Sequence, residues 1–155
     1  HTPTRRQRQM CIRDSFTGAL EIALHCDFVY TTNATKFGDT HTKFGLRPTW
    51  GMSQTLSRAV GQRRARELSF TAKTFNGAQA AVWGIANESF DTVEALDDAL
   101  AATCAQIIAN STEAVAAMKD LYRLAEREEG VRASLESELG LEYKISDTAE
   151  RLSKF

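Results

Sequence analysis

Long apolar runs, paired cysteines and proline are scarce in this sequence. The longest apolar stretches are far shorter than the roughly 20 residues of a membrane-spanning helix, and the Arg-rich start has no apolar segment typical of a secretory signal. The 155 residues include 2 prolines and 3 cysteines, and Cys11, Cys26 and Cys104 form no Cys-x-x-Cys spacing. We therefore expect reduced cysteines, no disulfide framework, no metal, no membrane association and a cytoplasmic or mitochondrial-matrix location.

A strong overall charge is also missing, since the formal net charge is −1, but the charged residues are unevenly distributed. Residues 1–15 carry a net +3, residues 16–90 another +3, and residues 91–155 a net −7. A basic half beside an acidic half favours an anionic ligand for the first. The arginines are scattered and form no coherent basic face, so the sequence does not favour nucleic acid as a partner.

Length and patterning predict one domain-sized chain with three segments. Residues 1–15 have no helical or strand periodicity and resemble translated adapter sequence, so we treat them as non-native and outside the fold. A basic arm for nucleic acid is the weaker alternative, because such arms repeat Lys and Arg among aromatic residues. Residues 16–90 are expected to form short strands and helices, and residues 91–155 a helical region.

Apolar spacing, glycines and capping residues place the individual elements. Asn76 is expected to cap a short helix that Gly84 ends, and Ser111 to cap a later one. Asp91 and Glu94 have the spacing of a capping box. Helices are expected over 18–24, 52–60, 63–70, 77–83, 132–139 and 148–155, along the apolar stripe from Val93 to Ile108, and from the Ser111 cap through Leu124 until residues 126–130 interrupt it. Strands are expected over 26–31, 36–40 and 85–89.

Glu21 is the first candidate functional residue, because it lies in the otherwise apolar run from Ala19 to Leu24 directly after Gly18. Burying an ionised carboxylate is costly, so such a group usually pairs or exchanges protons near neutral pH. Gly18 at the start of a helix leaves backbone N–H groups free to face a ligand. The alternative is that Glu21 lies on a solvated helix face, but its apolar neighbours favour the core.

Two strings of residues carry a family resemblance. TGALEIALHCD, over 17–27, and the segment over 36–89, which begins KFGDTHTKFGLRPTWGMSQTLSRAVG, resemble the enoyl-CoA hydratase/isomerase (crotonase) superfamily. The resemblance extends over residues 16–155 and implies an α/β, crotonase-like (ClpP/crotonase) fold, here truncated, with a C-terminal helical trimerisation region. The N-terminal part of the family has no counterpart here, so we expect a fragment with an incomplete site.

The resemblance implies roles for three residues of the site. The Gly18 N–H would be one of two oxyanion-hole donors to a thioester carbonyl, the second lying in the absent part. Glu21 would activate the water that adds to the double bond. His41 stands where better-known hydratases have the Glu of a Pro-Glu pair, and it would exchange the second proton; alternatively it only hydrogen-bonds a loop carbonyl.

Further residues fall where the family lines its acyl pocket, namely Pro48, Trp50 and Gly51. Trp50 would either limit substrate length or pack in the core. For His25 beside Cys26 we expect core packing, since adjacent side chains point apart. A cluster of arginines on one predicted helix would meet CoA phosphates, contact an adjacent subunit, or lie on a solvated face, which we favour. These are Arg63, Arg64 and Arg66.

The resemblance implies an enzyme of acyl-CoA metabolism, a lyase that hydrates a 2-enoyl-CoA. The CoA thioester is its substrate, and no separate cofactor is expected. An enoyl-CoA isomerase of the same superfamily and a non-catalytic protein that binds CoA or RNA are the alternatives. Family members assemble through their C-terminal helices, so a homotrimer or hexamer is expected.

Overall fold

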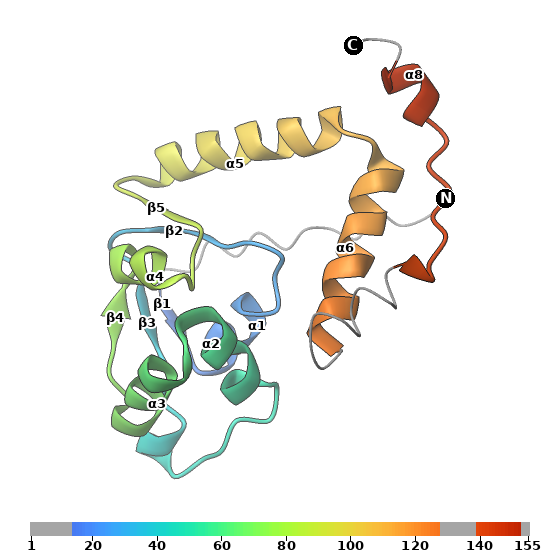
Figure 1. Cartoon of the computed structure of the whole chain (residues 1–155). Coiled ribbons are helices and arrows are strands. Elements are labelled where there is room, and N and C mark those ends of the chain that lie inside the picture. The colour runs from blue at the N-terminus through green and yellow to red at the C-terminus, as the bar shows by residue number, and fades with distance from the viewer. Residues whose placement is uncertain (1–13, 128–138, 153–155) are drawn as a thin grey trace. The chain divides into compact units, whose positions relative to one another are not determined.

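Two small sheets organise the first part of the chain in the computed structural model, which describes residues 14–127 and 139–152. Strands β1 (Asp14–Phe16), β3 (Lys36–Gly38) and β4 (Phe75–Asn76) form one sheet in the order β1-β3-β4 (Figure 1). β1 is parallel to β3, and β4 is antiparallel to it. β2 (Tyr30–Thr32) and β5 (Glu88–Phe90) form a separate parallel pair. The fold is therefore mixed α/β, as expected.

The first described strand begins before the expected boundary at Phe16. Asp14 and Ser15 belong to β1 and pair with residues 36 and 37 of β3. Residues 1–13, the rest of the segment that the sequence analysis excluded from the fold, lie outside the described residues, as does nearly all of the helix expected over 132–139.

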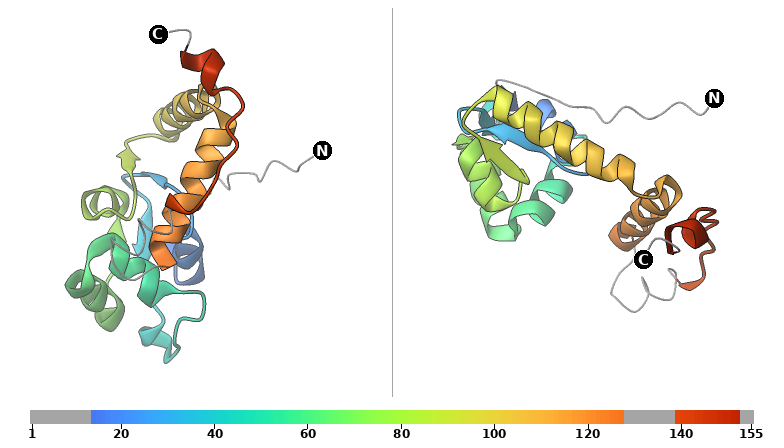
Figure 2. Two further views of the ribbon diagram at one scale, coloured as in Figure 1. Left: turned by 45° about the vertical axis from the view of Figure 1, so that its right-hand side comes forward. Right: turned by 90° about the horizontal axis from the view of Figure 1, so that it is seen from above.

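Helices connect and cover the strands at the positions that apolar spacing predicted. The shorter ones are α1 (Gly18–Ala23), α2 (Met52–Val60), α3 (Gln62–Thr71), α4 (Gly77–Trp83) and α8 (Thr148–Leu152). The longer ones are α5 (Val93–Ala109) and α6 (Thr112–Arg127), two separate straight helices in Figure 2. A 3-10 turn spans Thr42–Phe44 after β3.

The core lies between the β1-β3-β4 sheet and helices α1 to α4. Phe37 and Phe75 are cross-strand partners in β3 and β4, and their rings stack 5.5 Å apart. Such aromatic pairs stabilise a short sheet that has few backbone hydrogen bonds of its own. The buried cluster comprises Leu20, Phe37, Met52, Leu56, Ala65, Leu68, Phe75, Ala80, Ile85 and Ala86.

The start of α4 packs against β2 more closely than any side chain permits. Asn76 caps the helix as predicted, because its Oδ1 accepts a hydrogen bond from the Gln79 N–H while the Gln79 side chain accepts from the Asn76 N–H. A Cβ on Gly77 would lie 1.9 Å from the Thr32 carbonyl oxygen. Only glycine fits here, so the close approach of the α4 and β2 backbones requires glycine at position 77.

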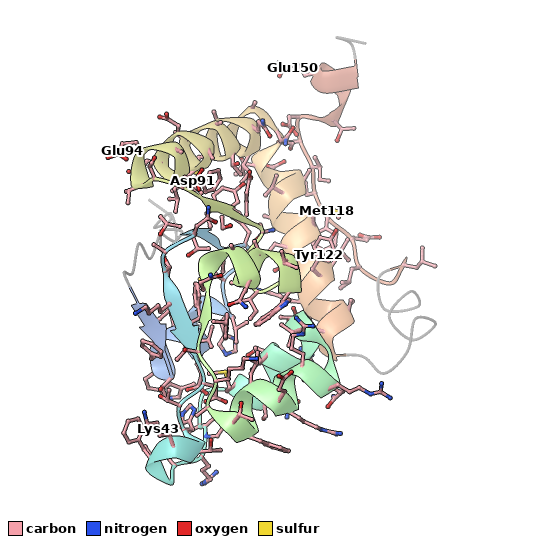
Figure 3. The ribbon with its side chains drawn as sticks, turned by 90° about the vertical axis from the view of Figure 1, so that its left-hand side faces the viewer. Lys43, Asp91, Glu94, Met118, Tyr122 and Glu150 are labelled. Atoms are coloured by element: carbon pink, nitrogen blue, oxygen red, sulfur yellow. The ribbon has the colours of Figure 1, made fainter. Side chains whose placement is uncertain are left out.

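The capping box expected at Asp91 and Glu94 is wrong by one residue. Thr92 Oγ1 accepts the hydrogen bond from the Ala95 N–H at 3.1 Å, whereas Asp91 accepts one from the Asn33 side chain. Figure 3 shows Asp91 and Glu94 at the start of α5. The cap at Ser111 is confirmed by its hydrogen bond from the Ala114 N–H.

Two predicted strands are shorter than expected because helix ends extend into them. The Cys26 N–H donates to the Ala23 carbonyl, so the strand predicted over 26–31 begins only at Tyr30. The N–H groups of Ile85 and Ala86 both donate to the Ala80 carbonyl, which closes α4 and delays β5 to residue 88. The local turn bonds therefore take precedence over the apolar pattern at both places.

The chain divides into two compact units within α5, between Leu100 and Ala101. In the second unit, the Ser146 N–H and Oγ both donate to Glu113 of α6. Met118 and Tyr122, labelled in Figure 3, lie one turn apart on α6 and are 49% and 69% exposed. None of the described helices is long and apolar enough to cross a bilayer.

Candidate active site

A strained turn joins β1 to α1 and presents Gly18 as the first helical residue. Thr17 has φ 49° and ψ −110°, a conformation that non-glycine residues rarely adopt. Its N–H donates to the Gly38 carbonyl at 2.9 Å, and its Oγ1 lies 2.5 Å from Thr40 Oγ1. The end of β3 therefore holds the turn, and the Gly18 N–H begins a helix without an intrahelical acceptor.

Glu21 is buried, with 2% of its surface exposed, as its apolar neighbours predicted. Its Oε1 accepts hydrogen bonds from the backbone N–H groups of Trp50 and Met52, each 3.1 Å away. Met52 begins α2, so the carboxylate also satisfies an orphan donor of that helix. These bonds fix the loop before α2 against α1 and leave the second carboxylate oxygen, Oε2, to other partners.

That second oxygen faces the residue from which the sequence predicted proton exchange. His41 Nε2 lies 3.7 Å from Glu21 Oε2, and its other ring nitrogen, Nδ1, lies 2.7 Å from Asp39 Oδ1. The three residues are 2 to 6% exposed. Asp39 Oδ1 also accepts a weak hydrogen bond from the His41 N–H at 3.3 Å. An imidazole is thus held between two buried carboxylates.

The alternative that His41 only bonds a loop carbonyl through its ring is not what the structure shows. The recorded partners of its two ring nitrogens are carboxylates. Asp39, which precedes Thr40 and His41 in the segment that carries the family resemblance, had no role assigned from the sequence, and its 2.7 Å contact with His41 Nδ1 adds it to this candidate site.

Trp50 lies over the N-terminal end of α1. A Cβ added to Gly18 would lie 2.9 Å from Cζ3 of the indole, so the ring rests directly against the glycine. The side chain is 59% exposed, which is more than core packing allows. Gly51, with φ 100°, follows it at the start of α2, and Pro48 is half-buried two residues before it.

His25 corrects a prediction, because it is exposed rather than packed in the core. Its Nε2–H donates to the Trp50 carbonyl at 2.7 Å, and its ring lies against Gly51. Both backbone polar groups of Trp50 are consequently hydrogen-bonded, its N–H to Glu21 and its carbonyl to His25. The sequence had no signal for this contact, because 25 residues separate its partners.

The remaining candidate groups of the sequence contribute little to this geometry. Arg64 stacks over the Trp83 ring at 4.4 Å, while Arg63 and Arg66 are exposed. The Cys26 thiol donates to the Ile22 carbonyl at 3.6 Å, Cys104 is partly buried, and Cys11 lies outside the described residues. No group of three or more His, Cys, Asp or Glu within residues 14–127 and 139–152 is arranged to hold a metal ion.

The chain matches the model of the enoyl-CoA hydratase/isomerase family over residues 14–153. It is 40% identical over 85 residues to an Arabidopsis thaliana protein named "Probable enoyl-CoA hydratase 1, peroxisomal", which covers 55% of this chain and 32% of that protein. The chain thus spans about a third of the length of this relative.

Solved structures share the fold. An enoyl-CoA hydratase from Mycobacterium smegmatis is 36% identical with a TM-score of 0.68, over 71% of this chain and 50% of that one. A Thermobifida fusca protein named as an enoyl-CoA hydratase, solved with acetoacetyl-CoA, is 27% identical with a TM-score of 0.75, over 92% of this chain and 52% of that one. The expected fold is therefore confirmed.

Proposed function

Because the chain belongs to the enoyl-CoA hydratase/isomerase family, we propose that the protein carrying it adds water across the double bond of a 2-enoyl-CoA. The acetoacetyl-CoA complex of the Thermobifida fusca relative supports an acyl-CoA thioester as the ligand. One observation carries the proposal: a buried carboxylate, Glu21, is fixed by two backbone N–H groups one helical turn after Gly18 and faces His41.

In this mechanism the Gly18 N–H donates to the thioester oxygen. Negative charge develops on that oxygen as water attacks the β-carbon, so a donor fixed in advance lowers the barrier. The bonds that Thr17 makes to the end of β3 support this role, because they hold the turn that aims the N–H.

Glu21 takes a proton from the attacking water, and His41 is the second group that exchanges protons during the addition. A carboxylate whose Oε1 already accepts two N–H bonds cannot rotate freely, so its orientation is set before substrate binds. Pro48, Trp50 and Gly51 would line the acyl side. The indole over Gly18 would then limit the space beside the thioester.

The test is hydration of crotonyl-CoA by the natural protein that contains this sequence, followed as loss of the unsaturated thioester. Glu21→Gln keeps the shape of the side chain and is expected to lower kcat by about 10² to 10⁴ with little change in KM. Glu67→Gln, an exposed glutamate of α3, is the matched control. Unchanged turnover in Glu21→Gln would exclude the mechanism.

The isomerase alternative is separated by labelled water. A hydratase incorporates solvent oxygen into the 3-hydroxyacyl product, whereas an isomerase converts a 3-enoyl-CoA to its 2-enoyl isomer without oxygen uptake. Incorporation of solvent oxygen supports the proposed hydratase activity. Isomerisation of a 3-enoyl-CoA without incorporation of solvent oxygen would show that the protein is an isomerase instead.

We further propose that the protein self-associates as a trimer or a hexamer. The exposed apolar side chains of α6, which include Met118 and Tyr122, support a helix face that is covered by another copy. Sedimentation of the natural protein measures its mass directly, and a monomer at micromolar concentration contradicts this proposal.

A further inference from the structure

Asp39 is buried beside the proposed proton-transfer pair and has no role in the mechanism above. It is 2% exposed, and its Oδ1 lies 2.7 Å from His41 Nδ1. A carboxylate so deep in the protein is costly unless it is hydrogen-bonded. The imidazole makes the shorter of the two contacts that His41 forms with Oδ1, the other being the His41 backbone N–H at 3.3 Å. Because an ionised carboxylate has no proton to donate, it accepts a hydrogen bond from Nδ1–H.

We propose that Asp39 is a positioning residue that keeps the proton of His41 on Nδ1, so that Nε2 exchanges protons with Glu21. The inference rests on the proposed function. With Nδ1–H committed to Asp39, the ring is oriented and its Nε2 lone pair faces Glu21 Oε2 at 3.7 Å. A direct hydrogen bond requires these atoms to approach by roughly 0.5 to 1 Å.

The proton balance of this route is simple. Water adds its oxygen to the β-carbon and gives one proton to Glu21, which passes it from Oε2 to His41 Nε2. The imidazolium then lies between Asp39 and Glu21, and the anionic Asp39 stabilises it. The same proton returns through Glu21 to the α-carbon, so the net change is the addition of one water molecule.

The contacts of His41 favour this route over direct contact of His41 with substrate. Its Nδ1 lies 2.7 Å from Asp39 Oδ1, and its Nε2 lies 3.7 Å from Glu21 Oε2, so a carboxylate faces each ring nitrogen. Glu21 lies on α1 one helical turn after Gly18, whereas His41 follows β3. In this route Glu21 is the catalytic residue, and His41 acts through it.

The tautomer of His41 tests the inference independently of turnover. In the natural protein labelled with ¹⁵N-histidine, the two ring nitrogens of His41 are assigned by their loss in His41→Gln. We expect Nδ1 to carry a proton in the wild type. In Asp39→Ala, Glu21 becomes the one recorded carboxylate facing the ring, so the proton of the neutral ring is expected to move to Nε2. A bare Nδ1 in the wild type overturns the inference.

Turnover supplies the second measurement. Asp39→Asn keeps an acceptor oxygen but removes the charge, and Asp39→Ala removes both, so kcat is expected to fall in that order, by about 10- to 100-fold for Ala, at constant KM. Asp91→Asn, an exposed aspartate that bonds Asn33, is the control. Asp39 variants with the kcat of this control overturn the inference. A wild type with Nδ1 protonated but no hydration of crotonyl-CoA overturns the proposed function alone.

Discussion

Removing the Glu21 side chain is expected to loosen the loop before α2 as well as to stop proton transfer. In Glu21→Ala, the Trp50 and Met52 N–H groups lose their common acceptor, Oε1. In Glu21→Gln, the amide oxygen still accepts both bonds. The two variants therefore separate the structural role of the residue from its charge.

The magnitude follows from the burial of the two donors. The Met52 N–H is buried, and leaving a buried donor unsatisfied costs about 1 to 3 kcal/mol; the partly buried Trp50 N–H adds about 1 kcal/mol. We expect Glu21→Ala to lower the free energy of unfolding by about 3 kcal/mol, which corresponds to about 6 to 12 °C in Tm for a chain of this size. Glu21→Gln is expected to lose about 1 kcal/mol or less.

Thermal unfolding followed by circular dichroism measures the difference, and amide hydrogen exchange at Trp50 and Met52 locates it. Both amides should lose protection in Glu21→Ala and keep it in Glu21→Gln. Glu67→Ala removes an exposed glutamate that pairs with Lys73 at 3.6 Å, and should cost about 1 kcal/mol or less. Equal Tm values for Glu21→Ala and Glu67→Ala would refute the role of Glu21 as the anchor of the loop.

Two further predictions concern the scaffold. In Gly77→Ala the new Cβ would lie 1.9 Å from the Thr32 carbonyl oxygen, so we expect the free energy of unfolding, measured by urea titration, to fall by about 3 kcal/mol or more. The control is Gly45→Ala, at φ 67° with no atom within 4 Å, which should lower it by only about 1 to 2 kcal/mol. Equal losses in the two variants would contradict the close contact at Gly77. Hydrogen bonds from Ser146, chiefly from its N–H, hold the pKa of Glu113 below its usual value of 4.5, so their stabilising contribution is present above that value and is lost as the pH falls through the lower, folded pKa. The Ser146 amide shift should therefore titrate with a midpoint below 4.5, and a midpoint at or above 4.5 contradicts this pairing.

Local signals predicted most of the helices because their causes lie within a few residues. The capping box of Asn76 and Gln79 needs only a spacing of three residues. The same reasoning failed at Asp91, where Thr92 caps α5 and the carboxylate turns to Asn33, a residue 58 positions away. Strand boundaries were less accurate, because turn bonds after α1 and α4 use the backbone groups that the strands would need.

In the candidate site, too, features set by neighbouring residues were predictable from the sequence, and long-range contacts were not. The burial of Glu21 was predictable, since its neighbours in the sequence are apolar. The clamp on the Trp50 peptide was not, because Glu21 and His25 reach it across 29 and 25 residues. Exposure of His25 likewise depends on how the loop before α2 crosses α1.

By itself, the sequence determined the family resemblance, the glycine that begins α1, and the carboxylate one turn later, because these depend on residue identity and helical spacing. Only the tertiary structure decided what the carboxylate faces. Parallel pairing of β1 with β3 places the end of β3 beside the start of α1, and this brings Asp39 and His41 to Glu21. Long-range strand pairing has no short-range signal in the chain, so the grouping of Glu21, His41 and Asp39 became visible only in the fold.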